Sequence, residues 1–265
     1  MTLSNIVRRA AAVALGLATP LGAQAQESDA ALASKLSNPV ASLTSVPFQL
    51  NHDCCFGPDE GARQTLNIQP VIPFAVSDDW NLIVRTIIPV IHQERTSANN
   101  GEATGLGDVT QSFFFSPSSS GGLTWAVGPV LLYPTGSSDF SARKWGAGPS
   151  ALVLKQNKGW TYGVLANHIW SVAGDEDRND VDLTFVQPFM SWTSPRATTV
   201  GINTEATYNW RTRSWTAPVN LTVSQLYKFG SQRVSLGGGV KIYAARDGSG
   251  PAWGARVTTT LLFPR

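Results

Sequence analysis

The chain has 265 residues, of which 42% are hydrophobic and only 14% are charged, well below the roughly 25% charged residues of soluble domains. Its formal net charge of +2 at pH 7 leaves no strongly basic surface, so we exclude nucleic acid as a partner.

The first 25 residues have the pattern of an export signal. Two positive charges, Arg8 and Arg9, precede an apolar run over 10–18, and the sequence Ala23-Gln24-Ala25 follows. A charged start, a short apolar stretch and an A-x-A site are typical of a secretory signal peptide. We therefore expect a mature chain that begins at Gln26 and has lost two positive charges. The alternative is an uncleaved buried helix.

A short segment, residues 26–38, separates this signal from the rest of the chain. Ala30 to Leu36 predicts a short helix, capped by Asp29 and ended before Pro39. We expect this segment on the periplasmic side, either in the mouth of a barrel or as a simple leader. Beyond it no stretch has the roughly 20 apolar residues of a transmembrane helix. An exported, charge-poor chain with nine Trp is then either a soluble β domain or a membrane β-barrel.

Alternating residues favour the membrane barrel. Side chains along a strand point to opposite faces in turn, and the run 214–229 separates into an apolar and a polar set. The apolar set is Trp215, Ala217, Val219, Leu221, Val223, Gln225, Tyr227 and Phe229. Aromatic residues stand near both ends of this face, as at the two lipid–water interfaces of a barrel wall. The run is also longer than the 5–6 residues of an average soluble strand and long enough to span a bilayer at a tilt.

The same period predicts an all-β fold, a transmembrane antiparallel up-and-down β-barrel of about twelve strands over residues 39–265. The predicted strands are 39–50, 64–76, 80–93, 106–116, 123–134, 145–156, 160–172, 181–193, 197–210, 214–229, 233–246 and 251–263. Short turns alternate with longer polar connections such as 51–63 and 94–105. Because outer-membrane barrels have short periplasmic turns and long outer loops, we expect both termini in the periplasm. Ten strands is the alternative.

The two cysteines, Cys54 and Cys55, are adjacent and fall in the predicted first outer loop. In an oxidising compartment they could form a vicinal disulfide. Two free thiols, or a soft-metal site with His52 and Asp53, are the other possibilities, and we predict no metal.

No catalytic motif is present. The three histidines lie outside HExxH, and neither GxSxG nor a phosphate-binding glycine loop occurs. His168 could belong to a hydrolase on the barrel wall, but it alternates with Ala166 and Trp170, which favours a packed or interfacial histidine. The acid-rich run 175–180 could bind Ca²⁺, but its spacing favours a solvated outer loop. We predict no enzyme and no cofactor.

Charged residues on the predicted inner face are the candidate site. They are Arg85, Asp108, Asp182, Glu205, Lys228, Lys241 and Arg256. Four cations and three carboxylates nearly balance, so they could either line a polar path or close the lumen with salt bridges. Side chains can fill much of a barrel of this size, and both interpretations stay open.

Several motifs together resemble one family. They are Leu36–Leu43 (LSNPVASL), Leu66–Pro73 (LNIQPVIP), Trp80–Ile83 with Arg85, Gly105–Asp108 (GLGD), Lys144–Pro149 (KWGAGP) and Asn167–Trp170 (NHIW). The chain resembles the outer-membrane transporter family that is also labelled after the phenol-degradation pathway protein MetA. The resemblance covers essentially the whole mature chain. It implies an outer-membrane barrel with a transport role, for example for hydrophobic or aromatic compounds, and it transfers no catalytic residue.

Three functions follow as hypotheses. The first is an outer-membrane channel for passive uptake of small molecules. The second is a plugged barrel with a structural or adhesive role, and the third is a membrane hydrolase. The expected partners are membrane lipid, the outer-membrane assembly machinery and an unidentified small solute.

Overall fold

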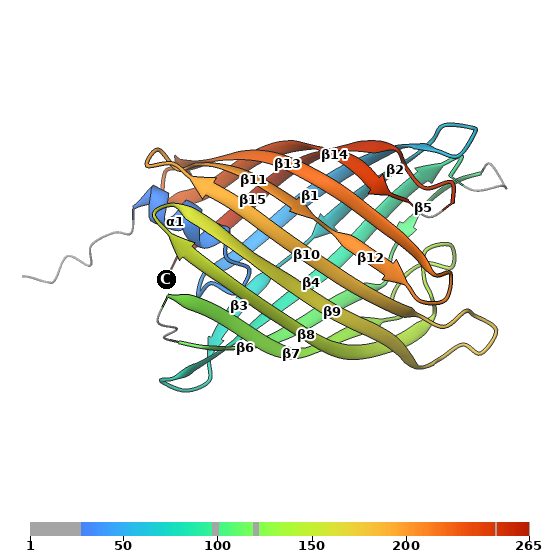
Figure 1. Ribbon diagram of the computed structural model, residues 1–265, viewed down its shortest axis with the longest axis horizontal. Helices are drawn as coiled ribbons and strands as arrows, with labels where there is room; N and C mark the ends of the chain where they lie inside the picture. The colour runs from blue at the N-terminus through green and yellow to red at the C-terminus, as the bar shows by residue number, and fades with distance from the viewer. Residues whose placement is uncertain (1–27, 97–100, 119–121, 247, 265) are drawn as a thin grey trace, which may run out of the picture.

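The computed structural model describes residues 28–96, 101–118, 122–246 and 248–264. The predicted signal peptide, residues 1–25, lies outside them. Figure 1 shows one closed barrel of tilted strands, with a short helix, α1, at the end where the C-terminus also lies. No helix among the described residues is long and apolar enough to cross a membrane.

The barrel wall consists of twelve strands, three of which are each broken into two segments. The segments are β1 (Thr44–Phe56), β2 (Gly61–Ile68), β3 (Val71–Ala75), β4 (Trp80–Glu94), β5 (Glu102–Leu106), β6 (Val109–Pro117), β7 (Leu123–Tyr133), β8 (Lys144–Asn157), β9 (Trp160–Gly174), β10 (Asp182–Thr193), β11 (Thr198–Thr204), β12 (Ala206–Asn209), β13 (Ser214–Phe229), β14 (Gln232–Ala245) and β15 (Trp253–Phe263). The broken wall strands are β2/β3, β5/β6 and β11/β12. Each wall strand pairs antiparallel with the next, and β1 pairs with β15 to close the cylinder. The predicted fold class and strand number are confirmed.

The first strand differs from its prediction at both ends. It begins at Thr44 rather than at residue 39, because residues 37–43 turn into the barrel instead of joining the wall. Val40 and Leu43 are buried there, with exposed fractions of 5% and 6%. At its other end the strand continues to Phe56. The predicted outer loop over 51–63 is wrong, since only a turn at 57–60 connects β1 to β2.

The helix α1 (Asp29–Leu36) begins where the side chain of Ser28 accepts a hydrogen bond from the backbone N–H of Ala31. Ser, Thr and Asp are favoured at this capping position because they satisfy free N–H groups of the first turn. The predicted cap, Asp29, is wrong, since it is the first residue of the helix itself. The buried face of the helix, Leu32 and Ala33, packs against Leu43 and three wall residues. The wall residues are Ala197, Leu226 and Leu262.

Two polar contacts fix the helix to the wall. The carboxylate of Asp29 pairs with the guanidinium of Arg233 on β14 at 2.8 Å. The side-chain amide of Gln156, on β8, donates to the backbone carbonyl of Ser34 at 2.9 Å. Because β8 and β14 belong to separate parts of the wall, these contacts hold α1 in the end of the barrel where the short turns lie (Figure 1).

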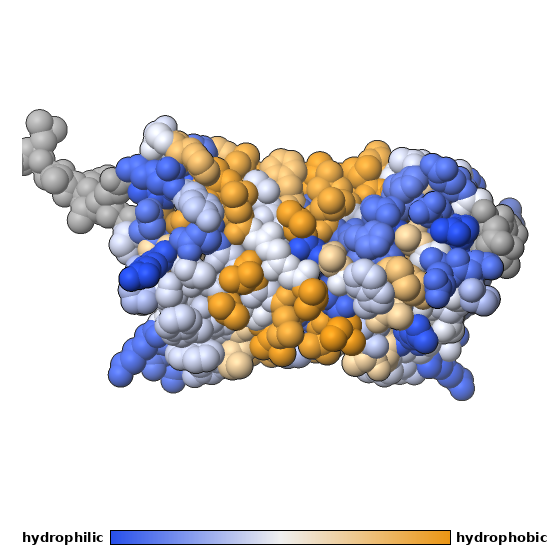
Figure 2. Space-filling view, turned by 90° about the horizontal axis from the view of Figure 1, so that it is seen from above, coloured by the Kyte–Doolittle hydropathy of each residue, from blue (hydrophilic) through white to orange (hydrophobic). Residues whose placement is uncertain are grey.

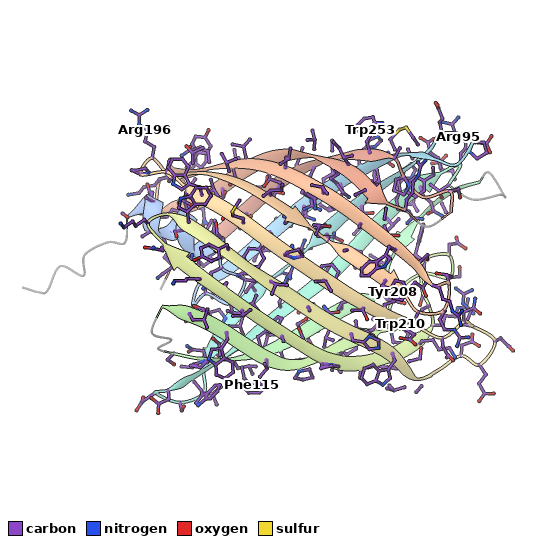
Figure 3. All side chains as sticks on the ribbon, in the orientation of Figure 1. Arg95, Phe115, Arg196, Tyr208, Trp210 and Trp253 are labelled. Atoms are coloured by element: carbon purple, nitrogen blue, oxygen red, sulfur yellow. A yellow bond between two sulfur atoms is a disulfide. The ribbon has the colours of Figure 1, made fainter. Side chains whose placement is uncertain are left out.

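The outer surface of the wall is apolar across its middle. Figure 2 shows a band of hydrophobic residues between two hydrophilic ends. Leu221, Val240 and Val257 in this band are each 50% exposed or more, a fraction that water would penalise and lipid does not. Aromatic side chains lie toward both ends, as Figure 3 shows for Phe115 on one side and Trp253 on the other. The wall therefore has the surface of a membrane-spanning barrel.

Candidate functional site in the barrel lumen

The interior of the barrel is divided into an apolar and a polar half. The apolar half, here called the inner apolar cluster, is Val40, Ile83, Phe114, Ala126, Leu152, Leu154 and Leu165. Apart from Val40, these residues come from β4 and β6–β9, so side chains fill that part of the lumen. The polar half lies along β1, β2 and β11–β15, and it also takes in Arg85 and Gln93 of β4. Most charged residues of the candidate site gather there.

Arg256 is the centre of the polar half. It lies on β15 with an exposed side-chain fraction of 6%, and its guanidinium donates to both carboxylate oxygens of Glu205 at 2.9 Å and 2.7 Å. A third hydrogen bond, of 2.7 Å, runs from Arg256 Nε to the side-chain oxygen of Asn51 on β1. This bidentate geometry is the strongest that a guanidinium and a carboxylate form.

A second ion pair lies nearer the end of the lumen opposite α1. Lys241, on β14, donates to Asp53 of β1 at 2.6 Å, and the hydroxyl of Tyr243 donates to the same carboxylate oxygen at 2.8 Å. Lys241 and Asp53 expose only 6% and 11% of their side chains. Next to this pair, Arg63 of β2 donates to the side-chain oxygen of Gln93 on β4. Each of these groups thus has a polar partner inside the barrel.

Arg85 has a different environment. Its guanidinium, on β4, donates to the side-chain oxygen of Gln69 at 2.8 Å, and no carboxylate within the described ranges forms an ion pair with it. Glu205 lies close enough to act on the charge of Arg85 only at longer range. Arg85 and Arg256 both line a cavity of about 320 Å³ between the N-terminal segment and the wall, whose strands β1, β3, β4, β10, β11 and β13–β15 all contribute to its lining.

Four of the seven predicted lumen residues lie together inside the barrel. They are Arg85, Glu205, Lys241 and Arg256. Lys228 has the inward parity, but it is exposed at the rim of the barrel at the α1 end, one residue before the end of β13. Asp108 and Asp182 have other roles, described next, so for these two the prediction of a lumenal position is wrong.

Asp108 anchors a loop at the end of the barrel opposite α1. It lies between β5 and β6, and its carboxylate accepts hydrogen bonds from the backbone N–H groups of Gly136 and Ala142 and from the hydroxyl of Ser141. All three donors belong to the connection between β7 and β8. The acid-rich loop after β9 joins this connection through Arg178, which donates to the Ser141 carbonyl at 2.6 Å. Asp108 therefore holds together the loops at this end of the barrel and does not lie in the lumen.

Asp182 lies on the outer face of the wall. It pairs across the ladder with Trp170, a lipid-side residue, and its carboxylate lies 3.3 Å from Nε2 of His168. The other ring nitrogen of His168 shares a 2.8 Å hydrogen bond with the hydroxyl of Thr184, which also accepts from the indole of Trp210.

This cluster has the order of hydroxyl, imidazole and carboxylate that hydrolases use. It lies within the regular β9–β10 ladder, however, where backbone N–H groups are already paired, whereas acyl transfer needs free donors for an oxyanion. The cluster therefore fits the interfacial role expected for His168.

Asn51, Asp53 and Arg63 lie in the lumen, where the sequence analysis did not place them. The predicted loop 51–63 contained all of them. The signal was present, because Leu50, His52 and Cys54 alternate with Asn51 and Asp53, which continues the period of β1 past the predicted boundary.

Cys54 and Cys55 are joined by a disulfide, the first of the three possibilities considered. They lie at a β-bulge near the C-terminal end of β1 rather than in a loop, and Cys55 has a positive φ of 70°. Among the described residues, no group of three or more His, Cys, Asp or Glu side chains is arranged to hold a metal ion.

A closed barrel of twelve antiparallel strands with an apolar outer band and a charged interior defines an outer-membrane β-barrel. Residues 63–258 match the family model described as "Putative MetA-pathway of phenol degradation", and the chain belongs to this family, as the sequence motifs indicated. No curated protein matches the sequence.

Solved structures share the fold. An outer membrane channel from Pseudomonas putida F1 superimposes with a TM-score of 0.66 and 13% identity, covering 84% of this chain and 96% of that one. The β domain of the Bordetella autotransporter BrkA gives a TM-score of 0.46 with 10% identity, covering 84% and 100%. Outer membrane phospholipase A from Escherichia coli gives 0.43 with 10% identity, covering 83% and 92%. At these identities the comparison shows the barrel fold.

Proposed function

We propose that this protein is a passive outer-membrane channel for small molecules, narrowed at its periplasmic mouth by its own N-terminal segment. The observation that carries the proposal is the cavity of about 320 Å³ in the polar half of the lumen. It lies between α1 with residues 37–43 on one side and the Arg256–Glu205 pair on the other. Fully interdigitated side chains, as in an ordinary protein core, would leave no such space.

The mixed character of the lumen fits small hydrophobic or aromatic solutes. The cavity is lined by amide side chains such as Gln187 and Asn203 and by the hydrocarbon of Leu43 and Val71, so a solute in it meets both hydrogen-bonding groups and hydrocarbon. The family description names phenol degradation, and the most extensive structural likeness given above is to a channel. Both support the proposal of a transport role over an enzymatic one.

The contact that seats the helix provides the test. Arg233→Ala removes the guanidinium that holds Asp29 and should loosen α1. In planar bilayers, we expect small, infrequent current steps from the purified protein and larger or more frequent steps from this variant. Lys228→Ala is a matched control, because Lys228 lies opposite Arg233 in the β13–β14 ladder. The substitution removes a positive charge from the same rim and leaves the Asp29–Arg233 ion pair in place.

A second variant tests the helix directly. The amide of Gln156 contacts both the carbonyl and the hydroxyl of Ser34, so a Ser34→Cys, Gln156→Cys double variant can tie the helix to the wall. Oxidation should suppress the steps, and a reductant should restore them. Folded protein that stays silent both as wild type and as Arg233→Ala would contradict the channel and favour a plugged structural barrel.

A further inference from the structure

The lumenal cavity has an unbalanced charge. Among the described residues that line it are two arginines, Arg85 and Arg256, and no carboxylate. Glu205 neutralises Arg256 through the bidentate pair but does not itself line the cavity. Asp53, the other carboxylate of this part of the lumen, is paired with Lys241. The positive charge of Arg85 is therefore left facing the cavity with only the neutral Gln69 amide as its hydrogen-bond partner.

An arginine in this position contributes little to the stability of the barrel and is well suited to bind a ligand. A partly buried charge is costly unless an opposite charge compensates it, and one hydrogen bond to an amide oxygen leaves most of the five N–H donors available. The planar guanidinium matches a carboxylate in a bidentate arrangement better than any other side chain does. The missing component at Arg85 is therefore an anion.

The other lining residues define the rest of the ligand. Gln187 and Asn203 add amide groups to the cavity, whereas Leu43 and Val71 add hydrocarbon. Val71 also packs against the inner apolar cluster. A volume of about 320 Å³ lies at the lower end of the roughly 300–1,000 Å³ range of small-molecule sites. A fitting ligand has one carboxylate and a compact apolar body.

From these observations we propose that the cavity is a binding site for small organic carboxylates, in which Arg85 binds the carboxylate group. The role of this site in transport rests on the channel function proposed above, whereas the binding of a carboxylate does not depend on it. The site gives the channel a preference for anions and for solutes that combine one negative charge with a hydrophobic part.

Equilibrium binding tests the site without any need for conduction. Titration calorimetry of the detergent-purified full chain with benzoate should show saturable binding at one site. Benzyl alcohol and benzylammonium, which keep the ring and change the head group, should bind at least about tenfold more weakly, equivalent to about 1.4 kcal/mol. Chloride in excess should compete weakly, because it lacks the apolar body.

Variants at Arg85 decide the assignment. Arg85→Gln should weaken benzoate binding by about tenfold or more, and Arg85→Lys, which keeps the charge but loses the fork, should give an intermediate affinity. Arg196→Gln is the matched control, since Arg196 is exposed in the turn between β10 and β11 at the periplasmic end (Figure 3) and should leave binding unchanged. Heat-dependent mobility on gels verifies that each variant is folded.

Reversal potentials separate this proposal from the channel itself. In a salt gradient the wild type should prefer anions, and Arg85→Gln should reduce that preference. Benzoate binding that depends on Arg85 in a protein without conductance would retain the site and overturn the channel. Conductance with equal affinity for benzoate and benzyl alcohol, or with no effect of Arg85→Gln on binding, would retain the channel and overturn the site.

Discussion

Arg256 and Glu205 form a bidentate ion pair, with hydrogen bonds of 2.9 Å and 2.7 Å, from wall strands that are not neighbours. Two further strands, β13 and β14, separate β15 from the β11/β12 strand in the wall. The pair therefore reaches across part of the lumen, and Asn51 extends it to β1. The ion pair therefore connects two wall strands that share no backbone hydrogen bonds.

The first prediction concerns this pair. Glu205→Gln keeps the shape but leaves the guanidinium of Arg256, only 6% exposed, without its counter-charge. Breaking a buried pair in this way should lower the free energy of unfolding by about 3 kcal/mol. The double variant Glu205→Gln, Arg256→Gln should recover much of that loss. Urea titration of the protein in lipid vesicles measures both, and an unchanged unfolding midpoint for Glu205→Gln would show that the pair contributes no stability.

A second prediction tests which face of β13 meets lipid. Leu221 is 50% exposed and lies in the middle of the strand opposite Val240. Leu221→Arg should cost about 2–4 kcal/mol, as for a charge near the bilayer midplane. Ser224→Arg places the same side chain at the wall of the lumenal cavity, where it can reach water, and should cost much less. Equal losses from the two substitutions would contradict the assigned faces.

The third prediction concerns orientation in the membrane. The loop 175–181 connects β9 to β10 at the end opposite α1, whereas Lys158 lies in a two-residue turn between β8 and β9 at the same end as α1. An epitope tag inserted between Glu176 and Asn179 should bind antibody on intact cells. A tag at Lys158 should bind only after the outer membrane is opened, and the reverse pattern would invert the proposed topology.

The barrel could be predicted from the sequence because its signal is local. A period of two along runs such as 214–229 fixes which side chains share a face, and neighbouring strands repeat the pattern. The same rule failed at Asp182, where an acidic side chain on an outward position was assigned to the lumen. Near the end of a strand the outer face meets headgroups and water rather than hydrocarbon, so charge there does not reveal the face.

The interior arrangement could not be predicted in the same way, because it depends on contacts between distant parts of the chain. Asp29 and Arg233 are 204 residues apart, and no local pattern connects them. The segment 39–43 resembled the start of a strand by composition, but Val40 packs against the inner apolar cluster and Leu43 against α1. Tertiary packing therefore decided where the first strand begins.

The position at which α1 docks has a consequence for the order in which the barrel assembles. Two of its wall partners, Arg233 and Leu262, belong to β14 and β15, which follow all other described strands in the chain. The helix, although synthesised near the beginning, has no complete docking surface until the final strands have joined β1. Docking of α1 is thus coupled to completion of the wall, and a barrel that has not yet closed lacks both the β1–β15 pairing and the docked helix.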